Sequence, residues 1–150
     1  MKKEKLVDKS NLGAYLLPGR IKNPNDGIYQ ATKSEELGLG TLWLSERWGN
    51  KDLGAIFGAV TQAAPSAYIA AGTTHFLTRH PIVLASMAMT LQSLSKEKFI
   101  LGIGRGVAEM FQPIGLPNIS FEYLIDCVTI HKKLCNGELV NYDGKIGKYT

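Results

Sequence analysis

The fold class of this sequence is indicated most clearly by the segment Leu37-Gly38-Leu39-Gly40-Thr41-Leu42-Trp43-Leu44. Its glycines mark the end of a helix that we predict over residues 24–37, because glycine adopts the left-handed conformation that stops a helix. Residues 41–44 then form a short continuous apolar run, which is typical of a strand covered on both faces. A helix that passes so quickly into a buried strand indicates a parallel α/β sheet.

The same alternation of strand and helix recurs along the chain. The other predicted strands cover residues 12–17, 68–71 and 99–103. The other predicted helices cover residues 52–64, 80–95 and 120–135, and a hairpin that turns at Asp143-Gly144 covers residues 139–149. Four strand–helix units in strict alternation predict parallel strands joined by right-handed crossovers. A closed barrel of eight such units needs about 250 residues, so a chain of 150 residues accounts for half of one.

Composition and charge narrow the class of protein. Apolar residues make up 45% of the chain and charged residues 20%, which favours one folded domain over a disordered segment. The net charge of +4 is small and dispersed, whereas a nucleic-acid groove concentrates basic residues on one face. No apolar stretch approaches the ~20 residues that cross a bilayer, and the start of the chain lacks the apolar core of a secretion signal. We therefore expect a cytoplasmic protein with no nucleic-acid and no membrane partner, and an anionic small ligand remains compatible with its charge.

The two cysteines lie in the last predicted helix. Cys127 and Cys135 are separated by about 12 Å of helical rise, which is too far for a disulfide. We expect both to be reduced and buried. His131 lies between them, but the spacing of these residues matches no metal-binding motif, so we predict no metal site.

Polar segments follow the second and third predicted strands, at the edge where α/β folds place their ligands. The first is Ser45-Glu46-Arg47-Trp48. Its acid, Glu46, either pairs with Arg47 or another base, or orients a substrate and moves a proton. The second is Gly72-Thr73-Thr74-His75, which offers hydroxyls, an imidazole and backbone N–H groups to a polar heterocycle. The same hydroxyls also serve to satisfy the backbone of a loop.

A glycine-rich segment, Gly102-Ile103-Gly104-Arg105-Gly106, follows the fourth predicted strand. It does not match the dinucleotide-binding motif, because Val107 stands where that motif needs its last glycine. Its alternate glycines either let a flat ring or a phosphate approach the backbone, or allow a helix to pack tightly on the strand. Thr78-Arg79-His80-Pro81 begins a helix, and a phosphate at that helix start is the alternative to a purely structural role.

Four segments together resemble the amino-terminal half of the bacterial luciferase-like superfamily, which contains FMN-dependent monooxygenases and oxidoreductases that use the deazaflavin coenzyme F420. These segments follow the order of the family and are residues 12–20, 37–47, 78–81 and 90–106. The resemblance implies a TIM (β/α)8 barrel with the ring at the carboxyl ends of the strands. Residues 1–150 would supply its first four βα units plus a terminal hairpin, and we expect the chain to be a fragment of a longer one.

The resemblance also implies roles for individual residues. A non-proline cis peptide at Gly72-Thr73 would back the ring, with Thr74 close to it, and Gly104-Arg105-Gly106 would approach the edge of the cofactor. Glu46 matches a position at which relatives place a polar group facing the active site. Some deazaflavin-using relatives carry an acid directly after the glycine segment, and here Val107 occupies that place.

We therefore predict an oxidoreductase that uses F420 to transfer a hydride to or from a small organic substrate. Glu46 and His75 are the predicted catalytic residues, because either would assist proton movement. The predicted cofactor-binding residues are Gly72, Thr73, Thr74, Gly104, Arg105 and Gly106. An FMN-dependent monooxygenase is the alternative among enzymes, and a non-catalytic half barrel that dimerises through its open edges is the alternative outside them. We expect the full-length form to be a homo-oligomer, most simply a dimer.

Overall fold

The computed structural model describes residues 7–149 and shows the predicted alternation of strands and helices. The strands of the main sheet are β1 (Gly13–Tyr15), β2 (Thr41–Leu44), β3 (Tyr68–Ala71) and β4 (Phe99–Ile100). The helices are α1 (Asn25–Leu37), α2 (Leu53–Ala63), α3 (Pro81–Leu94), α4 (Ala108–Phe111) and α5 (Phe121–Cys135). Short 3-10 turns, η1 (Lys9–Asn11) and η2 (Gln112–Ile114), and a hairpin of β5 (Tyr142–Gly144) and β6 (Gly147–Tyr149) complete the described chain.

The chain divides into two compact units. The first unit ends at Thr73 and resumes over Leu91–Gly102, so it contains the whole four-stranded sheet. The second unit contains Thr74–Thr90 and the described residues from Ile103 onward. Each unit is described separately below.

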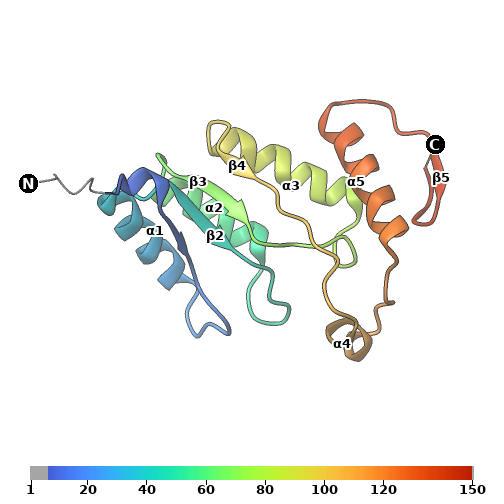
Figure 1. Cartoon of the computed structure of the whole chain (residues 1–150), viewed down its shortest axis with the longest axis horizontal. Helices are drawn as coiled ribbons and strands as arrows, with labels where there is room; N and C mark the ends of the chain where they lie inside the picture. Colours follow the sequence, from blue (N-terminus) through green and yellow to red (C-terminus); the bar gives the residue numbers. More distant parts are fainter. Residues whose placement is uncertain (1–6, 150) are drawn as a thin grey trace, which may run out of the picture. The chain divides into compact units, whose positions relative to one another are not determined.

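The sheet of the first unit has the strand order β1-β2-β3-β4, and all of its strands are parallel (Figure 1). The parallel direction confirms the prediction from the alternation of strands and helices. The first strand pairs Tyr15 with Trp43 of β2, which pairs in turn with Ala70 of β3. Because parallel strands end at the same edge, this register brings the segments that follow β1, β2 and β3 together.

One face of the sheet forms the core of the first unit. Leu42 and Leu44 of β2 are fully buried, as are Phe57 and Val60 of α2. The Phe57 ring meets that of Phe99 edge-on, with 5.1 Å between the ring centroids. Helix α1 contacts α2, and Figure 1 shows the two helices beside the strands. The apolar runs predicted to be strands are therefore buried by helices on this face.

The opposite face of the sheet carries aromatic side chains that remain accessible. Tyr15, Trp43, Ala70 and Ile100 form one register-matched row across the four strands. The exposed fraction is 45% for Tyr15, 39% for Trp43 and 44% for Ile100. Side chains alternate between the faces of a strand, so Trp43 lies on the face opposite to its buried neighbours Leu42 and Leu44. This row ends near the carboxyl edge where the candidate site lies.

Local signals in the sequence begin and end the helices as predicted. Gly38 follows α1 in the left-handed conformation, with a φ of 73°. The Asp52 carboxylate accepts a hydrogen bond from the Ala55 N–H at 2.9 Å and so caps α2. The Ser120 hydroxyl likewise accepts from the Tyr123 N–H at the start of α5. Each of these contacts satisfies a backbone group that a helix end leaves open.

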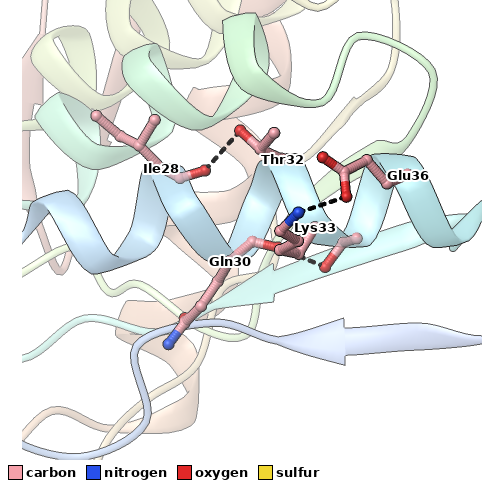
Figure 2. A network of polar contacts seen from close by, with 6 residues as sticks. Ile28, Gln30, Thr32, Lys33 and Glu36 are labelled. Atoms are coloured by element: carbon pink, nitrogen blue, oxygen red, sulfur yellow. Dashed lines mark hydrogen bonds and ion pairs between the residues drawn. The ribbon is translucent and has the colours of Figure 1, made fainter.

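The outer surface of α1 is stabilised by contacts within the helix itself (Figure 2). The Thr32 hydroxyl donates to the Ile28 carbonyl at 3.0 Å, and the Lys33 ammonium pairs with the Glu36 carboxylate at 2.6 Å. Both charged side chains are about half exposed, so water screens the pair. Gln30 extends away from the helix in the same view, and its role is described below.

The core of the second unit is built around buried rings and α5. Phe111, Ile130 and His131 are all buried. The ring of Phe76 meets that of His131 edge-on at 6.0 Å. Cys127 is also buried, which raises the pKa of its thiol to about 12. Aromatic and sulfur-bearing side chains thus fill this core.

Three predictions need correction. The strand predicted over 99–103 ends at Ile100, and Ile103 instead forms an isolated bridge with Thr74 in the second unit. The hairpin turns at residues 145–146 and not at Asp143-Gly144, and the Lys145 N–H in this turn donates to the Asp126 carboxylate of α5 at 3.1 Å. Both cysteines are free as predicted, but Cys135 is exposed.

No helix among residues 7–149 has the length and apolar character that a bilayer span requires.

Candidate functional site

The end of β3 is fastened to the end of β2 beyond the regular ladder. The Gly72 N–H donates to the Leu44 carbonyl at 2.6 Å, and the Glu46 N–H donates to the Thr73 carbonyl at 3.1 Å. The peptide bond between Gly72 and Thr73 is cis, which confirms the expectation drawn from the family resemblance. Glu46, Gly72 and Thr73, all predicted site residues, therefore lie together at the carboxyl edge of the sheet.

The indole of Trp43 lies directly against Gly72. A Cβ added at Gly72 would be 3.0 Å from Trp43 Cε3, which is closer than ordinary contact. Gly72 itself is half-buried and Thr73 is exposed. Together with the exposed part of Trp43, these residues form a flat surface of indole and bare peptide.

Gly102 has a packing role in the first unit. A Cβ added there would lie 2.0 Å from the Ala71 carbonyl oxygen, so any side chain would push β3 and the end of β4 apart. Neither interpretation offered for the alternate glycines describes this one, because it is the backbone of the neighbouring strand, and not a helix or a ligand, that requires glycine at position 102.

Glu46 lies in a charged and largely buried environment. Its exposed fraction is only 8%. Arg47 folds back so that its guanidinium Nη1 donates to the Glu46 backbone carbonyl at 2.9 Å. Lys51 is buried nearby. Burial and the Arg47 charge lower the pKa of Lys51, while the Glu46 charge opposes this shift. The acid therefore has two basic side chains in its vicinity.

The backbone after β1 adopts an unusual conformation that several contacts enforce. Leu17 has a φ of 48°, in the left-handed region that side chains other than glycine rarely adopt. Its N–H donates to the Gln30 side-chain oxygen at 2.9 Å, and its carbonyl accepts from the Lys51 ammonium at 2.6 Å. Its side chain packs so closely on Gly27 that a Cβ there would be 2.7 Å from Leu17 Cδ1. Such strain concentrates at functional sites, where surrounding contacts hold it.

Asn50 forms a second tie between the loops that follow β1 and β2. Its side-chain oxygen accepts from the Ile21 N–H at 2.8 Å, and its side-chain nitrogen donates to the Ile21 carbonyl at 3.1 Å. With Lys51, it links the two loops through buried or half-buried hydrogen bonds. These loops are therefore rigidly placed at the carboxyl edge.

Two polar residues at this edge were not predicted from the sequence. The hydroxyl of Tyr15, the last residue of β1, donates to the hydroxyl of Ser45, which directly follows β2. Ser45 is buried, whereas Tyr15 is exposed. Their positions after strands were visible in the sequence, but the contact depends on the register that pairs Tyr15 with Trp43.

Thr74 and Gly104, both predicted to bind the cofactor, lie together in the second unit. Thr74 is fully buried and forms the isolated parallel bridge with Ile103. Its carbonyl accepts from the Gly104 N–H at 2.9 Å. The segments after β3 and β4 are thus joined by backbone hydrogen bonds within this unit.

His75 is buried against Phe111, with 5.2 Å between the two ring centroids. Burial, and secondarily the Arg79 charge, lower its pKa from the usual 6.5 to about 4. Its Nδ1 accepts a hydrogen bond from the Leu77 N–H at 3.3 Å, so the neutral ring carries its proton on Nε2. His75 is therefore neutral at physiological pH.

The other predicted residues of the glycine segment contact aromatic rings of the second unit. Gly106 has a φ of 74°, and a Cβ there would lie 2.3 Å from Phe111 Cζ. The Arg105 guanidinium lies over the Phe121 ring, 4.8 Å from its centroid. Conformation and packing therefore both require glycine at position 106.

The start of α3 is partly covered by the hairpin. The Tyr149 hydroxyl is 3.3 Å from His80 Nε2, and the two rings lie 5.6 Å apart. His80 Nδ1 accepts from the Ile82 N–H at 3.4 Å. These contacts support the structural reading of this segment. Within residues 7–149, no three His, Cys, Asp or Glu side chains gather into a group able to bind a metal ion.

Comparison with known proteins places these features in a family. Residues 8–149 match the family model described as luciferase-like monooxygenase. The 5,10-methylenetetrahydromethanopterin reductase of Archaeoglobus fulgidus is 25% identical over 123 residues, which are 81% of this chain and 37% of that protein. The chain therefore spans well under half the length of this curated relative.

Solved structures share the fold. A coenzyme F420-dependent tetrahydromethanopterin reductase from Methanopyrus kandleri superposes with a TM-score of 0.78 at 21% identity, over 95% of this chain and 45% of that one. The oxygenating constituent of 3,6-diketocamphane monooxygenase from Pseudomonas putida, in complex with FMN, gives a TM-score of 0.74 at 21% identity, over 93% and 43%.

The four parallel βα units described here thus correspond to part of a TIM barrel. With its family model matched over nearly the whole sequence, the chain belongs to the luciferase-like monooxygenase family of oxidoreductases.

Proposed function

We propose that this chain is part of an F420-dependent oxidoreductase that transfers a hydride between the deazaflavin and a small organic substrate. The relatives named above support F420, because they include an F420-dependent tetrahydromethanopterin reductase and a methylenetetrahydromethanopterin reductase. The deazaflavin supplies the hydride chemistry when it is bound, and the protein orients the reactants.

The observation that carries this proposal is the flat surface formed by Trp43 and the cis Gly72-Thr73 peptide. A planar heterocycle needs an apolar surface for its face and hydrogen-bonding groups at its edge. Trp43 supplies the first in the first unit, and the surrounding hydroxyl and backbone groups supply the second. The residues present therefore fit a flavin-like ring.

Glu46 is the proposed proton-handling residue of this surface. Its backbone is fixed by the Thr73 carbonyl, which keeps the acid next to the cis peptide. Lys51 and Arg47 place positive charge near its side chain. His75 stays a predicted catalytic residue of the second unit. Thr74, Gly104, Arg105 and Gly106 likewise stay predicted cofactor ligands, with tight packing already explaining the glycine at 106.

We further propose that residues 1–150 form the amino-terminal half of such a barrel. The coverage of 45% of the F420-dependent reductase structure supports this, since the match is confined to four βα units. Joining the chain to the coding sequence that follows Thr150, and comparing the ligand affinity of both forms, tests the proposal. Equal affinity of the two forms would contradict it, because later strands would then add nothing to the site.

Tryptophan fluorescence gives a direct test of cofactor choice. Trp43 and Trp48 are the two tryptophans of the chain. We expect F420 to quench the emission saturably in the wild type and in Trp48→Phe, and to lose most of this effect in Trp43→Phe. The dissociation constant for F420 should be at least about tenfold lower than for FMN, a difference of ~1.4 kcal/mol in binding free energy. Tight FMN binding without F420 binding would overturn the choice of F420.

An FMN-dependent monooxygenase is the second candidate, because a similar structure is an FMN-bound monooxygenase. Oxygen consumption separates the two, since reduced FMN reacts with oxygen whereas a deazaflavin favours hydride transfer. We expect no protein-dependent oxygen uptake with either reduced cofactor. Uptake that requires both reduced FMN and the protein would favour the monooxygenase.

A further inference from the structure

The hydrogen bond between Tyr15 and Ser45 leaves a polar group facing the candidate site. Tyr15 donates its only hydroxyl proton to Ser45 Oγ. A phenol oxygen that donates its proton still has lone pairs that accept hydrogen bonds. Ser45 is buried whereas Tyr15 is exposed, so we take the tyrosine as the partner that a ligand can reach.

Tyr15 is adjacent to the flat surface of the first unit. It pairs with Trp43 across β1 and β2, and the Leu16 N–H donates to the Trp43 carbonyl at 2.8 Å. The Trp43 indole in turn lies against Gly72. The tyrosine oxygen therefore lies beside the surface that the proposed function assigns to the ring.

The segment after Tyr15 is also held more firmly than a surface loop needs to be. Leu17 keeps its left-handed conformation through two hydrogen bonds: its N–H donates to the Gln30 side-chain oxygen, and its carbonyl accepts from the Lys51 ammonium. A group that is fixed before binding loses less conformational entropy when it makes a hydrogen bond. The contacts that hold Leu17 would thereby also restrict the backbone next to Tyr15 and help to keep the tyrosine in one orientation.

We propose that Tyr15 is a ligand-binding residue whose oxygen accepts a hydrogen bond from a ring N–H of the bound heterocycle, with Ser45 as its positioning residue. This inference rests on the proposed function. It names the group that would be recognised. The pyrimidine part of flavins and deazaflavins presents one N–H, at N3, between two carbonyls. An acceptor at this place distinguishes such a ring from one that is methylated there.

A comparison of two ligands in two variants tests this assignment. The ligands are a deazaflavin and its N3-methyl derivative, which lacks the N–H, and the readout is quenching of Trp43 fluorescence. The wild type should bind the methylated ring about two- to tenfold more weakly, which corresponds to one neutral hydrogen bond. In Tyr15→Phe the two ligands should bind equally, because the phenylalanine ring retains the shape and removes the acceptor.

Two further variants complete the experiment. Tyr68→Phe is the matched control: Tyr68 is an exposed tyrosine of the same sheet, at the opposite end of β3, and it should leave the discrimination unchanged. Ser45→Ala keeps the phenol but removes its partner, so the discrimination should fall to an intermediate value. Circular dichroism and thermal unfolding verify that each variant is folded.

The outcomes separate this inference from the proposed function. If neither ring binds the wild type, either alone or joined to the coding sequence that follows Thr150, the proposed function fails. If the deazaflavin binds and Tyr15→Phe discriminates between the two rings as strongly as the wild type, the function stands and the role of Tyr15 is wrong. An equal loss of affinity for both rings in Tyr15→Phe would also overturn it, because the hydroxyl would then not recognise N3.

Discussion

The loops that leave β1 and β2 are held by different forces from the loop that leaves β4. In the first unit, side chains reach across and bond to backbone: Lys51 to the Leu17 carbonyl, Gln30 to its N–H, and Asn50 to both groups of Ile21. Hydrogen bonds depend strongly on direction. The positions of these loops therefore depend on individual hydrogen bonds.

In the second unit, the loop after β4 is held mainly by rings. Phe111 packs on His75 and fills the space over Gly106, while Arg105 stacks on Phe121. Packing of this kind depends on volume more than on direction. The contrast teaches that substitutions in the first unit should act through lost hydrogen bonds, and in the second through lost volume and changed burial.

Removal of the central ring should have the largest effect. Phe111 is almost completely buried, so Phe111→Ala leaves a cavity and should lower the free energy of unfolding by about 3–5 kcal/mol. Urea denaturation measures this change. Hydrogen exchange should show the loss of protection over α4 and residues 103–107, with little change in β1 and β2. An even loss over both units would break the contrast.

Acidification should have the second-largest effect, through His75 of the second unit. His75 has a pKa of about 4 in the folded protein against 6.5 when unfolded, so between these values only the unfolded chain takes up the proton. Stability is therefore unaffected above pH 6.5 and falls as the pH drops toward 4, by ~2 kcal/mol after allowance for partial solvation. The pH dependence of urea unfolding, compared with His75→Gln, measures this contribution. Parallel curves for the two proteins would show that His75 is not its source.

Loss of the buried ammonium should have a smaller effect. Lys51→Met keeps the apolar stem but leaves the Leu17 carbonyl without its donor, at a cost of ~1–2 kcal/mol. The cost stays moderate because the substitution also removes a buried charge, whose desolvation lowers the Lys51 pKa. Lys98→Met is the control, since the Lys98 ammonium also donates to backbone carbonyls but through solvent-exposed hydrogen bonds. Equal costs for the two variants would mean that burial does not strengthen the loop contacts.

Removal of the exposed ion pair of α1 should have the smallest effect on stability. Lys33 and Glu36 are one turn apart and solvated, so Lys33→Ala should leave the free energy of unfolding nearly unchanged. Thermal unfolding at low and high salt measures it. A larger effect would show that surface charge matters as much as the buried contacts of the loops.

The fold was largely predictable because its signals are local. Gly38 ends α1, Asp52 caps α2 and Ser120 caps α5 through contacts within a few residues. The hairpin shows the limit of such signals. Asp143-Gly144 is a typical turn pair, yet the turn lies two residues further on, where the Lys145 N–H donates to Asp126.

The candidate site was predictable only in part. Gly72 and Thr73 were recognised from the family resemblance, and the cis bond between them is confirmed. The contact between Tyr15 and Ser45 joins residues 30 positions apart, so it depends on strand register that no local pattern specifies. The conformation of Leu17 likewise arises from side chains distant in the sequence.

The two thiols of α5 differ enough to serve as separate chemical reporters. Cys135 is exposed, whereas Cys127 is buried and has a pKa of about 12, so an alkylating reagent should mark only Cys135 in the native protein. Cys127 becomes reactive only when the helix around it opens. The rate at which a second label is incorporated would then measure how often this helix opens, without any engineered probe.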